Sequence, residues 1–201
     1  MKMTPLDRVL LLVTGLLAAY QVVVGIDGFS TLPMVAYTIA FGVLLVAGLL
    51  LIILGFDVLD SPIVVIVSTI IPLALSLGMV WQHLPSLRGA YLVFVLLGFL
   101  AVVVTRTIPL CSPLPTVVLA LIHGVAGVII FLLPLLLVQQ GAMKPAFALV
   151  SAGGALIGIA GLLLSFLKTG RPILAQKTIL RILPGLLLVT TACFVVGFRF
   201  G

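Results

Sequence analysis

The sequence contains no glutamate and no asparagine, and its 201 residues include only four acidic side chains, all aspartates. Charged residues make up 7% of the chain, whereas a soluble domain carries about 25%. Without asparagine, the chain has no acceptor for N-linked glycosylation. A soluble fold of this size could not hide so many apolar side chains from water, because too much of a small domain is surface. The scarcity of charge therefore excludes an ordinary soluble protein.

Cysteine is also scarce, with only Cys111 and Cys193 in the chain. The two residues form no CxxC or other metal-binding spacing. Cys193 lies inside an apolar run, and Cys111 lies between two runs, on what would be the opposite side of a membrane. Since a disulfide requires Cα atoms within about 7 Å of each other, we expect both thiols to be unpaired. The sequence predicts no metal site and no cofactor.

Apolar residues make up 64% of the chain and are grouped in long runs. A membrane-spanning helix needs about 20 mostly apolar residues, and its backbone must bond internally because lipid offers no partners. The sequence therefore predicts an all-α, polytopic helix bundle, with one transmembrane domain over residues 1–201. Six spans remain an alternative to seven, because the fourth run is short. The predicted helices are Val9–Ile26, Leu32–Phe56, Pro62–Trp81, Leu87–Val104, Leu114–Val138, Pro145–Leu167 and Ile179–Phe198.

The ten lysines and arginines, which contribute to a net charge of +6, lie between these runs or at their ends. With seven spans, seven of the ten fall on the side of the N-terminus and three on the other side. Because cytoplasmic loops carry the excess of basic residues, we expect a plasma-membrane protein with its N-terminus in the cytoplasm and its C-terminus outside. The bilayer accounts for this charge, so we expect no nucleic-acid partner.

The longest polar stretch lies between the last two runs and carries four basic residues, Lys168, Arg171, Lys177 and Arg181. Basic side chains at a cytoplasmic membrane surface attract anionic lipid headgroups. We therefore predict that this stretch contacts anionic lipid. The alternative is that its charges only fix the orientation of the chain.

Small residues recur at spacings of three and four in the fifth and sixth runs. They are Gly124 and Gly127 in the fifth run and Ser151, Gly154, Gly158 and Gly161 in the sixth. Small faces let helix backbones approach each other closely, which is how helices associate in lipid. We therefore predict helix packing at these positions, within the chain, in a homo-oligomer or with a protein partner. Alternatively, the glycines line a pathway or admit a bulky ligand.

Three polar residues are candidates for a function. His123 is the one ionisable side chain well inside a run, and such residues often mark functional sites in membranes. The alternative is a neutral histidine bonded to a neighbouring helix. Asp57 and Asp60 lie between the second and third runs and would form a carboxylate pair for protons or a cation. The simpler interpretation of Asp60-Ser61-Pro62 is a helix start, with a cap followed by proline.

These features leave three functional classes. A non-enzymatic membrane subunit or scaffold fits the small-residue faces and the near absence of polar residues inside the runs. A small transporter or channel, for an ion or a hydrophobic small molecule, would use His123. An intramembrane or lipid-modifying enzyme needs a nucleophile, a base or a metal cluster, and the sequence shows no such motif. The sequence favours a subunit, with a transporter as the alternative and an enzyme last.

Overall fold

The structure is a computed structural model that describes residues 3–26, 28–108, 114–168 and 174–201, with only the backbone described for Asp60 and residues 165–168. In these ranges the chain forms α-helices, short 3-10 helices and no strand. Seven of the described helices are long and apolar enough to cross a membrane. The chain is therefore an all-α, multi-pass membrane protein, which confirms the predicted fold class.

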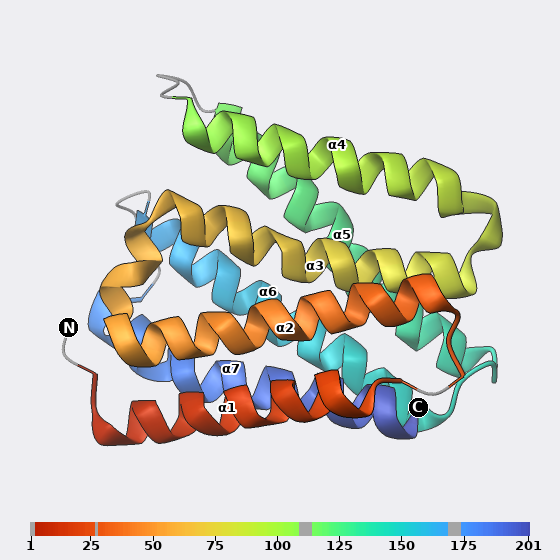
Figure 1. The fold of residues 1–201 in the computed structure, drawn as a ribbon, viewed down its shortest axis with the longest axis horizontal. Coiled ribbons are helices and arrows are strands. Elements are labelled where there is room, and N and C mark those ends of the chain that lie inside the picture. The colour runs from red at the N-terminus through yellow and green to blue at the C-terminus, as the bar shows by residue number, and fades with distance from the viewer. Residues whose placement is uncertain (1–2, 27, 109–113, 169–173) are drawn as a thin grey trace.

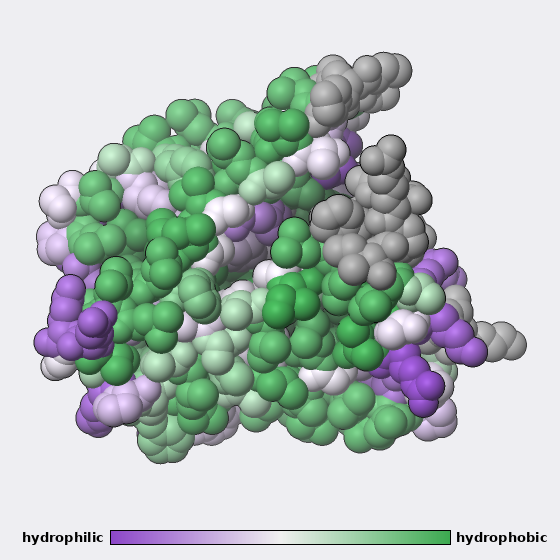
Figure 2. Space-filling model, turned by 180° about the vertical axis from the view of Figure 1, so that it is seen from behind, coloured by the Kyte–Doolittle hydropathy of each residue, from purple (hydrophilic) through white to green (hydrophobic). Residues whose placement is uncertain are grey.

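The seven helices are α1 (Pro5–Val24), α2 (Thr31–Leu54), α3 (Pro62–His83), α4 (Arg88–Thr107), α5 (Leu114–Gln139), α6 (Ala148–Lys168) and α7 (Gln176–Phe200). Three short 3-10 helices precede α3, α4 and α6; they are η1 (Phe56–Asp60), η2 (Pro85–Leu87) and η3 (Pro145–Phe147). Hydrophobic residues cover the middle of the molecule, and hydrophilic residues gather toward its two ends (Figure 2). This distribution is the one that a bilayer requires.

Several helix ends differ from the predicted ones for local reasons. Helix α1 begins four residues early because Thr4 and Asp7 form a capping box, in which each side chain accepts a hydrogen bond from the other's backbone N–H. Helix α2 stops before Phe56 because Gly55 has a φ of 76°, in the left-handed region that favours glycine. The predicted start of the sixth helix, Pro145, belongs to η3 instead.

Within the described residues, six helices form a closed ring, and α4 packs on the outside of this ring. Each of α1, α2, α3, α5, α6 and α7 packs against the next in that order, and α7 returns to α1. Helix α4 lies outside the ring and packs on α3 and α5. Figure 1 shows α1 to α4 as the nearer layer, with α5 to α7 behind. The chain begins at one end of the bundle and finishes at the other, and we call these the N-terminal and C-terminal ends (Figure 1).

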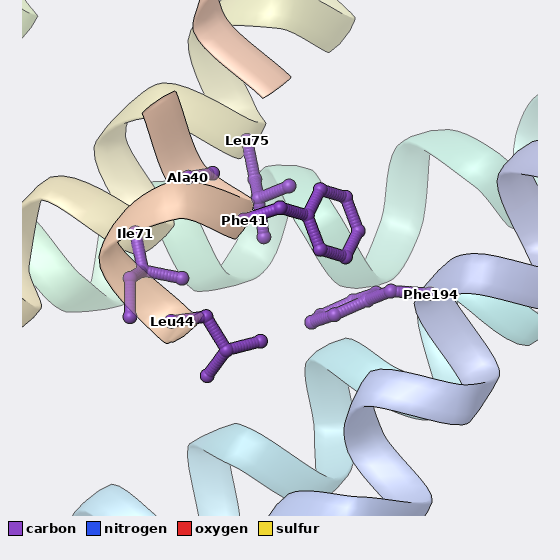
Figure 3. Close-up of a pocket in the computed structure, with 6 residues that line it drawn as sticks. All are labelled: Ala40, Phe41, Leu44, Ile71, Leu75 and Phe194. Atoms are coloured by element: carbon purple, nitrogen blue, oxygen red, sulfur yellow. The ribbon is translucent and has the colours of Figure 1, made fainter. Parts of the chain in front are cut away.

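The interior of the ring is filled with apolar side chains. Phe41, Leu44, Leu75 and Phe194 are buried together in the main hydrophobic cluster. The space between them is too narrow to hold a water molecule. It is lined only by apolar residues from α2, α3 and α7 (Figure 3). The centre of the ring is therefore a packed core.

Candidate functional site

Helices α5 and α6 are in close contact at Gly154 and diverge toward the N-terminal end of the bundle. A Cβ atom added at Gly154 of α6 would lie 2.7 Å from the Cγ2 atom of Ile130 of α5, so the two helices are in close contact there. Gly158 and Gly161 are four and seven residues further along α6, which places them on the same helix face as Gly154. Yet both are exposed, and a Cβ added at either would meet no described atom of a neighbouring element within 4 Å. Helix α5 therefore lies farther from α6 near Gly158 and Gly161 than it does at Gly154.

The same divergence is visible from α5. Gly127 and His123 are three and seven residues before Ile130, so they share the face with which α5 touches α6. Both are only half-buried, and a Cβ at Gly127 would also meet nothing within 4 Å. Figure 1 shows the two helices separating toward the N-terminal end, and Figure 2 shows a recess with pale and hydrophilic atoms inside the hydrophobic band. We call this recess the α5–α6 groove, lined by His123, Gly127, Gly158 and Gly161.

The predicted packing residues therefore differ in what they contact. Gly154 meets α5, and Ser151 is buried with its Oγ atom enclosed and without a hydrogen-bond partner among the described residues. Gly124 is exposed, with open space around it, and lies about 100° around α5 from His123, on the rim of the groove. A Cβ atom added at Gly124 or at any of the three groove glycines would meet no atom of another described helix within 4 Å. Packing against another protein stays a prediction for them.

The closest approaches of a helix glycine to the backbone of another described helix lie at Gly153 and Gly197, which were not among the predicted packing residues. A Cβ added at Gly153 would lie 2.8 Å from the Phe194 ring and 3.2 Å from the carbonyl oxygen of Thr190 in α7. A Cβ at Gly197 would lie 2.9 Å from the backbone nitrogen of Val150. The available signal was the Gly153-Gly154 pair, which offers two small faces at once. One faces α7, and the other faces α5.

His123 projects from α5 with one ring nitrogen already engaged. Its Nδ1 atom lies 3.0 Å from the carbonyl oxygen of Leu119. A carbonyl only accepts hydrogen bonds, so Nδ1 carries the hydrogen in this pair. In a neutral ring the Nε2 atom then holds a lone pair that is available to a donor in the groove. His123 is therefore suited to hold a hydrogen-bond donor of a ligand or partner, and the internal bond fixes its tautomer.

The two candidate aspartates lie away from this groove, before α3. Asp57 is exposed in η1, and the side chain of Asp60 lies outside the described residues. Helix α3 begins at Pro62 with Ser61 as its N-cap residue. Thus the helix-start interpretation of this segment holds, with Ser61 in the capping position. Within the described residues, no three metal-ligating side chains come together.

Two of the four predicted lipid-contacting residues, Lys177 and Arg181, are described with their side chains and lie at the N-terminal end of the bundle. Lys177 and Arg181 are exposed and one turn apart on α7, so they project on the same side. The side chain of Lys168, and all of Arg171, lie outside the described residues. Arg106, at the end of α4, was not among the candidates. Its Nη2 atom reaches the carbonyl oxygen of Pro115 in α5 at 3.5 Å.

The opposite end of the ring is closed by aromatic side chains. Phe29, Tyr37, Phe198, Phe147 and His83 form a circuit in which each ring contacts the next, at centroid distances from 4.6 to 6.0 Å. These residues come from α2, α3, α7, η3 and the α1–α2 connection. The circuit therefore ties five parts of the chain together at the C-terminal end.

No protein-family model, curated protein or solved structure matches this chain. The groove and the packed ring beside it are therefore the features of the molecule that bear on its function.

Proposed function

We propose that this chain is a non-enzymatic membrane subunit or scaffold, and that an apolar transmembrane helix of a partner protein packs into the α5–α6 groove. The observation that carries this proposal is the exposure of Gly158 and Gly161 on the same face that packs against α5 at Gly154. A glycine backbone that faces lipid gains little dispersion energy. A second helix that packs against it would add close van der Waals contacts.

The filled interior of the ring favours a scaffold rather than a channel. A hydrophilic solute needs a path with polar groups that replace its water. The gap at the centre of the ring is narrow and lined by apolar side chains such as Phe41 and Phe194 (Figure 3), and an aromatic circuit lies at one end. The groove, in contrast, opens sideways to the bilayer. These features favour an occupant that arrives from within the membrane.

The test uses Gly158→Leu, with Gly42→Leu as a matched control. Both glycines lie inside helices, and a Cβ at either would meet nothing within 4 Å, but Gly42 is in α2, away from the groove. The tagged full-length chain is purified from its native membrane in a mild detergent. We expect a stoichiometric membrane partner whose recovery falls about tenfold in Gly158→Leu, a loss of about 1.4 kcal/mol, and is unchanged in Gly42→Leu.

Two outcomes would contradict this proposal. One is a monodisperse wild-type chain that purifies without a membrane protein partner. The other is an equal recovery of the partner with both variants, because contact at the groove would then not be needed. Thermal unfolding of both variants in detergent provides the check that neither substitution has disrupted the bundle itself.

A second candidate is a carrier that holds a hydrophobic small molecule in the same groove. His123 favours it, because the Nε2 atom of the neutral ring would accept a hydrogen bond from a ligand at a depth where water is scarce. The glycines would leave room for the ligand's apolar part.

For the location of the protein, we propose the plasma membrane, with the N-terminal end of the bundle in the cytoplasm. The basic residues support this orientation. With seven spans, seven of the ten lysines and arginines fall on the same side of the membrane as the N-terminus.

A further inference from the structure

His83 has an unusual environment for a histidine at the end of a transmembrane helix. It is in the last turn of α3, and its ring lies between two phenylalanines, at centroid distances of 5.9 Å from Phe29 and 6.0 Å from Phe147. Its Nε2 atom is enclosed and has no hydrogen-bond partner among the described residues. The imidazole is therefore held in the aromatic circuit by ring packing rather than by a bond at Nε2.

The contacts around Phe29 include few hydrogen bonds. Tyr37, the other polar member of the circuit, is buried, and its Oη atom has no hydrogen-bond partner within the described part of the chain. The Phe29 ring lies 5.8 Å from that of Tyr37 and edge-to-face with that of His83. The N–H and the hydroxyl of Ser30 donate to the Oε1 atom of Gln82 at 3.2 and 3.3 Å, in an exposed position. Ring packing is therefore the main contact between the α1–α2 connection and the end of α3.

Protonation of His83 would change this environment. A neutral imidazole has one N–H, whereas the cation carries an N–H on both nitrogens. Ionisation thus places a charged donor at an enclosed Nε2 atom that no described acceptor meets, and an enclosed, unpaired charge is costly. The last turn of a helix and the face of a phenyl ring both favour a cation. Both effects are weaker than the loss of hydration at such a charge.

The charged groups at this end of the bundle act in the same direction. The charged side chains that are described at the C-terminal end are all basic, namely Arg88, Lys144 and Arg199. Positive charges in the same region disfavour a further cation. The side chain of Asp27, in the α1–α2 connection, lies outside the described residues, so the experiment below includes its own variant.

From these contacts we propose that His83 is the proton sensor of a latch at the C-terminal end of the ring. The neutral His83 ring packs against Phe29 and closes the aromatic circuit. When His83 gains a proton, its ring leaves the circuit for water, and the α1–α2 connection separates from α3 at Phe29. The orientation proposed above places this latch at the outer face of the membrane. The latch works without any occupant of the α5–α6 groove.

The first test is the pH dependence of thermal unfolding, measured between pH 7.5 and 5.0 on the purified full-length chain in detergent. Histidine is the side chain that ordinarily gains a proton in about this range. Since the neutral ring fits the folded state, its contribution to stability is present at the higher pH and is lost as the pH falls. We expect the Tm of the wild type to fall by about 4 °C more than that of His83→Phe, because phenylalanine keeps the ring packing and gains no proton.

Hydrogen exchange then locates the change within the chain. We expect the protection of amides in peptides that cover residues 25–30, corrected for the intrinsic effect of pH on exchange, to fall about tenfold in the wild type between pH 7.5 and 5.0. The same peptides should keep their protection in His83→Phe. The centre of α3 should be protected at both pH values in both proteins.

Two controls assign the pH dependence to His83. His123→Gln removes the other histidine of the chain and should retain the full response. Asp27→Asn removes the acidic group of the α1–α2 connection and should also retain it, because the latch depends on the imidazole and not on a carboxylate.

The proposal is overturned if His83→Phe responds to pH as the wild type does, or if Asp27→Asn abolishes the response. A wild-type Tm that rises at low pH relative to that of His83→Phe would also overturn it, since the circuit would then stabilise the cation. Unchanged protection over residues 25–30 would contradict the latch even if the Tm falls. His83→Gln, which also gains no proton in this range, maintains the test if His83→Phe does not fold.

Discussion

At the scale of single residues, the same residue type has opposite surroundings within one helix. Gly153 lies against α7 with almost no spare room, whereas Gly158, little more than one turn later, has open space around it. Both are glycines in an apolar helix, so sequence alone does not separate them. Their difference follows from where α6 meets its neighbours, and it makes the two positions a natural pair for mutagenesis.

We expect Gly153→Val to destabilise the protein and Gly158→Val to leave its stability almost unchanged. The added side chain at Gly153 would collide with the Phe194 ring and the Thr190 carbonyl oxygen, forcing α6 and α7 apart. Overpacking of this kind costs about 1–3 kcal/mol, which lowers the Tm by roughly 2–4 °C per kcal/mol in a chain of this length. Thermal unfolding in detergent measures both variants, and equal Tm values would contradict the packing at Gly153.

His123 provides a test of the second functional candidate. If a small molecule donates a hydrogen bond to Nε2, His123→Ala should weaken its retention about two- to tenfold, the range for one such bond. Organic extraction of the purified protein, followed by mass spectrometry, measures the retained molecule against protein. His123→Gln, which keeps a hydrogen-bonding side chain, should restore part of the retention. Identical extracts from wild type and His123→Ala would remove the reason for a carrier.

At the scale of helices, the sequence was sufficient to predict the number of spans and their approximate positions. Long apolar runs leave a chain in lipid with few choices other than helices. The ends were less predictable, because they depend on individual bonds. The capping box of Thr4 and Asp7 extends α1 into a polar segment, and the left-handed conformation at Gly55 stops α2 before an apolar Phe56.

The groove itself was only partly predictable, for a related reason. The regular spacing of Gly154, Gly158 and Gly161 correctly indicates that they share a helix face. Spacing along one helix contains no information on the angle at which a second helix crosses it. Since α5 and α6 separate beyond Gly154, the same face is covered at one point and open at the next. The contact between Arg106 and Pro115 was missed because it depends on how two helices are placed relative to each other.

At the scale of the whole molecule, the odd number of spans places the two termini at opposite ends of the bundle (Figure 1). This arrangement divides the basic residues unequally between the ends. Among the described residues, Arg8, Arg106, Lys177 and Arg181 belong to the N-terminal end, while Arg88, Lys144 and Arg199 belong to the other. The division of charge over the whole sequence is seven to three, and it is the physical basis for an orientation.

The orientation is tested with a reporter fused after Gly201. We expect a reporter that works only outside the cytoplasm to be active at this position, and a reporter that requires the cytoplasm to be inactive. The same two reporters, fused in the connection after α3 at Ser86 and in the connection after α2 at Asp57, serve as controls. The Ser86 fusion should agree with the one at Gly201, and the Asp57 fusion should give the reverse, because one helix separates neighbouring connections. Cytoplasmic activity at Gly201, with the expected activity at both controls, would contradict an odd number of spans. A reversal at all three positions would keep the seven helices and contradict only the orientation, since the positive-inside rule acts on the bundle as a whole.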